Sequence, residues 1–198
     1  MVNVFTRKFS LPEVDKKEAL RYAGIRNPSI LPEELMQKFD EAISLLDGKI
    51  SPRVCFCELD VNDCDFGSSL DIKKNLRDSK SVIFFAATVG LDLDRVISRY
   101  EILSPATAVL LDAIGSERVE ALCDEFCACL KEAKRAEGFS LRPRFSAGYG
   151  DLPIEFQKTV FDLLDPYSRI GVSLNDSYLM TPRKSVTAII GVEKIKEF

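Results

Sequence analysis

A long amphipathic helix is the sequence feature that most constrains the fold. Ser104 followed by Pro105 is a strong helix start signal, because serine can cap the first turn and proline suits the first helical position. Apolar residues then recur at helical spacing until a stop signal near Gly138. The apolar face comprises Val109, Ala113, Val119, Leu122, Cys123, Phe126, Cys127 and Leu130. This segment predicts the central helix of the fold.

The other predicted elements scatter strands among helices. Residues 81–89 (SVIFFAATV) predict a buried strand, because the segment is rich in β-formers and almost free of polar residues. Further strands are predicted at 53–61, 170–174 and 185–192, and further helices at 15–22, 31–47, 70–76, 91–101 and from Pro153 onward. Met180 and Pro182 are expected in a turn, with Met180 in the core. This order predicts an α+β fold rather than a regular βαβ winding.

The chain is expected to form one globular unit with a helical addition at its N-terminus. Its 198 residues are close to the usual size of one domain. Residues 1–50 are interpreted as an N-terminal helical appendage or lid, and residues 51–198 as the main domain. The longest apolar stretch is too short to span a membrane, and no apolar segment follows the basic N-terminal residues as in a secretory signal. We therefore expect a cytoplasmic protein with no membrane partner.

Charge and histidine content narrow the chemistry. The net charge is -4, with 27 basic and 31 acidic residues well mixed along the chain, so no phosphate-tracking stripe is expected. Nucleic acid is therefore not an expected partner. The chain contains no histidine, which excludes Ser/His and Cys/His triads and histidine-ligated metals within it. Any catalytic groups must therefore come from a ligand or a partner, or be of an unusual kind.

The cysteines are expected to be reduced, as in other cytoplasmic proteins. They are Cys55, Cys57, Cys64, Cys123, Cys127 and Cys129. Cys55 and Cys57 share one face of a predicted strand, and Cys123 and Cys127 one face of a predicted helix, so four thiols could converge on zinc. Core packing is favoured instead, because zinc pairs usually lie on loops or knuckles and free cysteine is a common core residue. We expect no metal site.

The segment 142–151 (RPRFSAGYGD) has neither a helical nor a strand period, and its glycines and proline predict an ordered loop. The Arg144 guanidinium could bind a carboxylate through two parallel hydrogen bonds. Glycines beside it allow positive φ and a close approach of the backbone to a flat ring. Together these features suit an amino-acid nucleotide. The alternative, a tight surface turn with Arg144 as an ordinary solvated charge, is the commoner reading of such a short motif.

Two elements of the chain resemble the activation domain of cobalamin-dependent methionine synthase. The first is R-x-x-x-G-Y, from Arg144 to Tyr149, and the second is M-x-P-x-x-S-V, from Met180 to Val186. They occur in the family's order, and the match is sharpest over residues 142–192. The resemblance implies that family's fold, in which an antiparallel or mixed sheet packs with helices, one of them long and central.

The resemblance implies a reactivation subunit rather than a self-sufficient enzyme. In that family the domain binds S-adenosylmethionine and docks over a cobalamin held by another module. An electron from a flavodoxin-like or ferredoxin-like donor and a methyl group from the ligand then repair inactive cob(II)alamin. The expected partners are that donor and a cobalamin-dependent methionine synthase lacking its own activation domain. Two alternatives remain: a non-catalytic or chaperone-like partner of another corrinoid methyltransferase, and a structural remnant without a ligand.

The motif match implies roles for residues of the loop. Arg144 would hold the carboxylate of S-adenosylmethionine, and the backbone from Ala147 through Gly148 and Tyr149 to Gly150 would line the adenine. The Tyr149 side chain would face the corrin and the reacting methyl group, which makes it the one catalytic candidate. The alternative is that Tyr149 simply packs on the body of the fold.

The ammonium group of the ligand needs an acidic partner. Asp124 and Glu120 are the candidates, because they lie one turn apart on one face of the predicted central helix. The alternative is that either carboxylate pairs with a neighbouring lysine or arginine, as carboxylates on helix surfaces commonly do.

Overall fold

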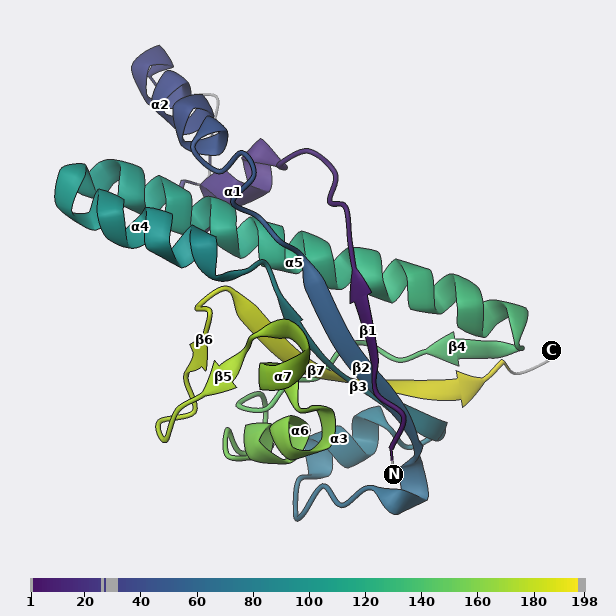
Figure 1. Cartoon of the computed structure of the whole chain (residues 1–198). Helices are drawn as coiled ribbons and strands as arrows, with labels where there is room; N and C mark the ends of the chain where they lie inside the picture. The colour runs from purple at the N-terminus through teal and green to yellow at the C-terminus, as the bar shows by residue number, and fades with distance from the viewer. Residues whose placement is uncertain (1, 26, 28–31, 196–198) are drawn as a thin grey trace.

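A computed structural model describes residues 2–25, 27 and 32–195 (Figure 1). Its centre is a five-stranded sheet in the order β1-β2-β3-β7-β4, and every neighbouring pair of strands is antiparallel. The strands are β1 (Phe5–Lys8), β2 (Arg53–Asp60), β3 (Ser79–Thr88), β4 (Phe139–Leu141) and β7 (Ser185–Lys194). A small second sheet contains β5 (Ser173–Leu174) and β6 (Met180–Thr181). The predicted α+β class is confirmed, with an antiparallel sheet.

Helices cover both faces of the main sheet (Figure 1). The long helix α5 (Pro105–Ala136) lies on one face, and α1 (Lys16–Tyr22), α2 (Glu33–Ser44) and α4 (Leu91–Leu103) pack against it. On the other face α6 (Phe156–Leu164) contacts β3, and α7 (Pro166–Ile170) contacts β2. The helix α3 (Leu70–Asn75) belongs to the same layer, after the short turn η2 (Val61–Asp63). The predicted central helix is confirmed as α5.

The alternation of side chains along β3 explains these two helical layers. In a strand, successive side chains point to opposite faces of the sheet. Ile83 and Phe85 accordingly enter the core beneath α5, whereas Val82 and Phe84 enter a second core beneath α6. Because β3 is buried on both faces, its sequence reads as a continuous apolar run.

The described part of the first 50 residues packs directly on the rest of the molecule. The strand β1 pairs with β2, and the buried Leu20 and Phe39 belong to the same core as Phe85. The connection before α1 is held by Arg118 of α5, which donates hydrogen bonds to the carbonyl oxygens of Pro12 (2.5 Å) and Glu13 (3.0 Å). These contacts bind the N-terminal segment to α5.

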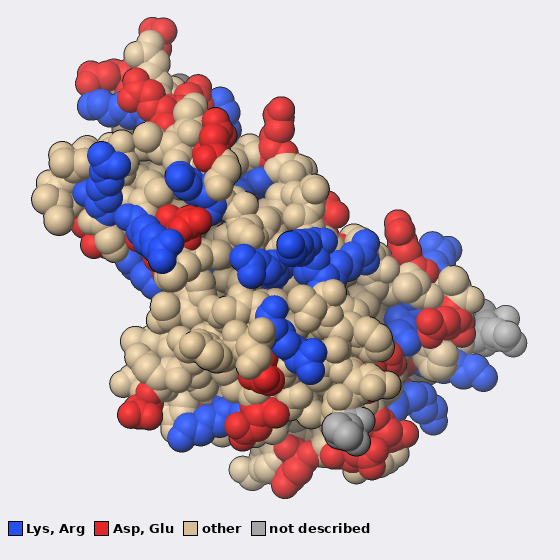
Figure 2. Space-filling view, in the orientation of Figure 1, with Lys and Arg blue, Asp and Glu red and all other residues tan. Residues whose placement is uncertain are grey.

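Charged side chains of both signs are spread over the surface. On the face seen in Figure 2, acidic and basic side chains are interspersed, with a short row of basic ones across the middle. Several form ion pairs, such as Lys16 with Asp40 at 2.6 Å. Within the described part of the chain, no helix combines the length and the apolar character needed to cross a membrane.

The predicted strand at 170–174 is wrong over its first residues. Asp165 caps the short helix α7 by accepting a hydrogen bond from the Ser168 N–H, and Pro166 suits its first turn. Gly171, with φ of 75°, ends the helix, so the strand β5 is only two residues long.

Other boundaries also differ from the predictions. The helix expected from Pro153 begins at Phe156, and the turn expected around Met180 contains β6. The helix expected over 31–47 is α2, which covers Glu33–Ser44, while Leu31 lies outside the described residues. The strands β1 and β4 have no counterpart among the predicted elements.

Candidate functional site

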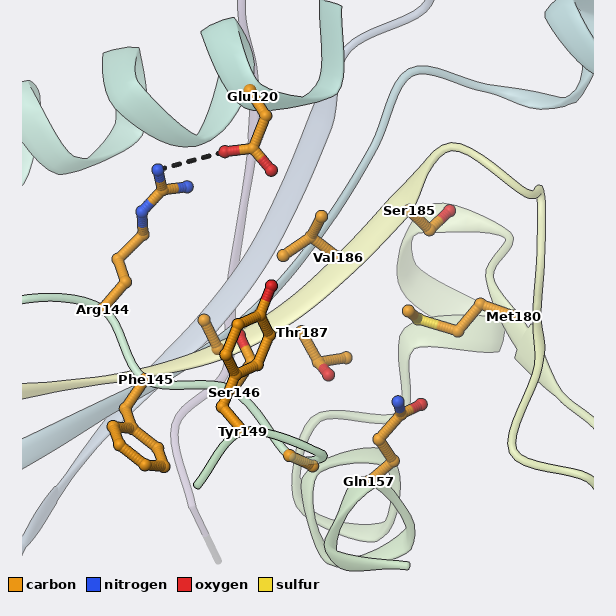
Figure 3. Close-up of a pocket in the computed structure, with 12 residues that line it drawn as sticks. Glu120, Arg144, Phe145, Ser146, Tyr149, Gln157, Met180, Ser185, Val186 and Thr187 are labelled. Atoms are coloured by element: carbon orange, nitrogen blue, oxygen red, sulfur yellow. Dashed lines mark hydrogen bonds and ion pairs between the residues drawn. The ribbon is translucent and has the colours of Figure 1, made fainter. Parts of the chain in front are cut away.

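An open pocket of about 450 Å³ lies beside β7, between α5 and α6 (Figure 3). Its walls come from the 142–151 loop, from β7 and from single residues of three other elements. The lining residues are Glu120, Arg144, Phe145, Ser146, Ala147, Tyr149, Gln157, Met180, Ser185, Val186, Thr187 and Ala188. The R-x-x-x-G-Y and M-x-P-x-x-S-V elements, which are separate in the sequence, therefore meet in one pocket.

The pocket exists because one edge of β7 is only partly paired. The strand β4 pairs with β7 at residues 192–194, and Phe145 adds an isolated bridge to Ile189 through hydrogen bonds of 2.9 and 2.8 Å. Among the described residues, no strand pairs with this edge of β7 at residues 185–188. Alternate residues of an antiparallel strand turn their backbone groups to the same side. The N–H and C=O of Thr187 therefore face the same edge as those of Ile189, toward the pocket.

Arg144 forms the charged end of the pocket with Glu120 of α5, and it also pairs with Asp124 of α5, which lies just outside the pocket. Its Nη2 atom donates to Glu120 Oε2 at 3.2 Å and to Asp124 Oδ1 at 2.9 Å. The Arg144 side chain is 28% exposed and that of Asp124 is 73% exposed. The fold thus brings together the three charged residues singled out from the sequence, and it pairs them with one another.

Asp151 ties the loop to the opposite helical layer. Its carboxylate accepts hydrogen bonds from the Ser69 hydroxyl and from the backbone N–H groups of Leu70 (2.7 Å) and Asp71 (3.1 Å), at the start of α3. The Ser69 hydroxyl above all, and then the Leu70 N–H, hold the pKa of Asp151 below its ordinary value. Gly150 has φ of 54°, and a side chain there would meet the Asp71 carboxylate, so glycine is needed at this position.

The remaining predicted loop residues divide into two groups. Ala147 and Tyr149 line the pocket, whereas Gly148, Gly150 and the helix residue Asp124 do not. Gly148 makes the bend, with φ of 86° and a hydrogen bond from its N–H to the Leu152 carbonyl at 2.9 Å. Tyr149 is 69% exposed, so its ring does not pack into the body of the fold.

Several lining residues were not singled out for the site from the sequence. Gln157 of α6 is only 7% exposed, and its Oε1 atom has no hydrogen-bond partner in the described structure. Met180, expected in the core, packs partly buried against the second core and also lines the pocket. Ser185 and Thr187 come from β7. The resemblance pointed to Met180 and Ser185, but no sequence signal points to Gln157.

The cysteines do not converge on a metal site. Cys55 and Cys57 lie in the core on the α6 side of the sheet, whereas Cys123 lies in the core on the α5 side. Burial raises the pKa of Cys123 to about 12 and that of Cys127 to about 11, so both thiols are protonated at neutral pH. Over the residues that the structure covers, no cluster of three or more histidine, cysteine, aspartate or glutamate side chains could hold a metal ion.

Comparison with known proteins identifies the fold. No protein-family model matches the chain, and no curated protein sequence matches it. A crystal structure of the MetH reactivation domain bound to AdoHcy (S-adenosylhomocysteine) does match, with a TM-score of 0.71 and 15% sequence identity. The match covers 100% of this chain and 80% of that one. The chain therefore has the fold of the MetH reactivation domain, which confirms the fold implied by the sequence resemblance.

Proposed function

We propose that this chain is an S-adenosylmethionine-binding reactivation subunit for a separate cobalamin-dependent methionine synthase. The observation that carries the proposal is the meeting of the two sequence elements in one open pocket, on a fold whose solved counterpart is bound to AdoHcy. Such a subunit would serve a synthase that lacks its own reactivation domain.

The charged end of the pocket suits the amino-acid part of the ligand. S-adenosylmethionine carries a carboxylate and an ammonium group on one carbon atom, and Arg144 and Glu120 offer the complementary pair of charges. The competing pair between Arg144 and the exposed Asp124 contributes little to stability, because water screens it. A bound ligand can therefore replace it at small cost, exchanging a weak surface pair for two charge-assisted contacts.

The Tyr149 side chain is assigned to the side of the pocket that meets the partner. Its exposure leaves the ring free to contact a second protein, and because Tyr149 lines the pocket, its backbone would lie against a bound nucleoside. A flavodoxin-like or ferredoxin-like donor would supply one electron and the sulfonium its methyl group, so that the partner's cob(II)alamin would become methylcobalamin and S-adenosylhomocysteine would be left. In this scheme the residues of the chain bind and orient the sulfonium, while the partner supplies the corrin.

The first test is thermal unfolding with added S-adenosylmethionine. A ligand at 100 times its dissociation constant stabilises the native state by about 2.7 kcal/mol. For a chain of this size that corresponds to a rise in Tm of roughly 5 to 10 °C. No rise at millimolar ligand would contradict the proposal.

The second test measures methyl transfer in trans. The protein is mixed with a cob(II)alamin-loaded synthase that lacks its activation domain, a one-electron reductant and methyl-labelled S-adenosylmethionine. Labelled methylcobalamin is expected only when all the components are present. Ligand binding without transfer would support the alternative, a non-catalytic partner of another corrinoid methyltransferase.

A further inference from the structure

The side-chain amide of Gln157 is buried, lacks a partner for its oxygen and points into the pocket. Gln157 lies on α6 and is 93% removed from solvent, since only 7% of it is exposed. Its Oε1 atom finds no hydrogen-bond donor among the residues described. Figure 3 shows the terminal amide pointing toward Thr187 and Met180. Because an unsatisfied buried amide destabilises a fold, a leucine or methionine would serve the core better at this position.

The two ends of the pocket differ in charge. Among the described residues that line it, Glu120 and Arg144 alone are charged, and both lie at the α5 end (Figure 3). Gln157 lies at the other end, near the neutral side chains of Thr187 and Met180. The α6 end therefore suits an uncharged group that offers both hydrogen-bond donors and acceptors.

We propose that Gln157 recognises the adenine base of the nucleoside through its exocyclic amine. This inference rests on the proposed function and deepens it. With an amino acid held at Arg144 and Glu120, the base of the same ligand extends toward the α6 end. A glutamine amide matches adenine in two ways: its oxygen accepts from the exocyclic amine, and its nitrogen donates to a ring nitrogen. The open edge of β7 at Thr187 offers further backbone groups beside the base.

The test compares two ligands on two proteins by titration calorimetry. The ligands are S-adenosylhomocysteine and its analogue in which purine, without the exocyclic amine, replaces adenine. The proteins are the wild type and Gln157→Met, which keeps the length of the side chain but removes the amide. The matched control is Gln37→Met, the same change at an exposed position of α2.

The wild type and the control should bind the adenine ligand about tenfold more tightly than the purine analogue, because one buried hydrogen bond is at stake. Gln157→Met should bind both ligands weakly and with equal affinity. The variant should melt no lower than the wild type without ligand, because it removes an unsatisfied polar atom from the interior.

Equal binding of S-adenosylhomocysteine by the wild type and Gln157→Met would overturn the inference and leave the proposed function standing. No binding by the wild type would overturn the proposed function, and the inference with it. If Gln157→Met does not fold, the wild type alone decides, because equal affinity for the two ligands would show that the exocyclic amine is not recognised.

Discussion

Helix α5 takes part in two arginine–carboxylate clusters that have opposite surroundings. Near its middle, Arg118 donates to Glu117 at 2.5 and 2.6 Å, and the two side chains are only 6% and 5% exposed. About one and two turns further on, Glu120 and Asp124 meet Arg144 at the edge of the open pocket. The contacts of the first cluster all lie inside the protein, since Arg118 also donates hydrogen bonds to the backbone of the N-terminal segment. The second retains contacts that solvent, and hence a ligand, can reach.

Burial, rather than the type of ion pair, therefore distinguishes Arg118 from Arg144. A buried pair cannot be broken without leaving a charge stranded in the interior. A pair at the rim of a pocket contributes little to stability and can be exchanged for contacts with a ligand. The two clusters should therefore respond differently to the same substitution.

The largest effect is expected at the buried cluster. Arg118→Ala should lower the free energy of unfolding by about 3 to 5 kcal/mol, because Glu117 is left buried without its partner. Urea denaturation measures this loss. The double variant Glu117→Leu/Arg118→Met should lose less than the single variant, since it strands no charge. A single variant as stable as the wild type would show that the two clusters are energetically alike.

Arg144→Ala tests the open cluster. Removing the charge-assisted hydrogen bonds to the ligand carboxylate, worth about 1.5 to 3 kcal/mol, should raise the dissociation constant for S-adenosylmethionine about tenfold or more. The unfolding free energy should change by less than about 1 kcal/mol. Calorimetric titration reports the first quantity and denaturation the second. Arg95→Ala, which removes an exposed arginine paired with Asp92, is the matched control and should leave both unchanged.

The two carboxylates of the open cluster should differ from each other. Glu120 lines the pocket, whereas Asp124 lies outside it. Glu120→Gln should therefore weaken S-adenosylmethionine binding by roughly five- to tenfold, through the lost ammonium contact. Asp124→Asn removes only a solvent-screened pair and should change the affinity by less than about twofold. If Asp124→Asn weakened binding more than Glu120→Gln did, Asp124 rather than Glu120 would be the partner of the ligand's ammonium group.

The smallest effect is expected at Asp151, which holds the pocket loop to the start of α3, and this effect should depend on pH. The pKa of Asp151 is lower in the folded chain than its ordinary value, so the unfolded chain takes up a proton first as the pH falls. The stabilisation by this carboxylate is complete above about pH 5 and disappears as the pH falls through the lowered pKa. Asp151→Asn should therefore melt below the wild type at pH 7, and the gap should narrow below pH 4. If the difference in Tm between the two proteins did not change with pH, the negative charge of Asp151 would not be needed to hold the loop.

The parts of the fold that were predicted correctly carry local signals. Ser104 and Pro105 set the start of α5, and the apolar run of β3 reflects burial on both faces. The strand β1 escaped prediction because all four of its residues are exposed, which leaves no alternation to detect. The strand predicted at 170–174 began too early, at the last residue of α7, because Ile170, Val172 and Leu174 recur at every second position as in a strand.

The candidate site was predictable only in part, for a related reason. Arg144 and the glycine bend follow from a contiguous motif, so the sequence points to them directly. The pairing of Arg144 with Glu120 and the placement of Gln157 depend on how α5 and α6 lie beside β7. Nothing near Gln157 in the chain distinguishes it from an ordinary helix residue, because only the folded chain shows that its amide oxygen is buried with no hydrogen-bond partner among the described residues.

The early end of β4 has a consequence beyond the pocket. An unpaired strand edge is a template for pairing with a foreign chain, and proteins usually keep such edges short or covered. The uncovered stretch of β7 is confined to residues 185–188, with α5 on one side and α6 on the other. A stretch this short offers few hydrogen-bonding groups to a foreign strand. The fold thus leaves a few backbone hydrogen-bonding groups at the pocket without a described strand partner, but it does not present a long open strand edge.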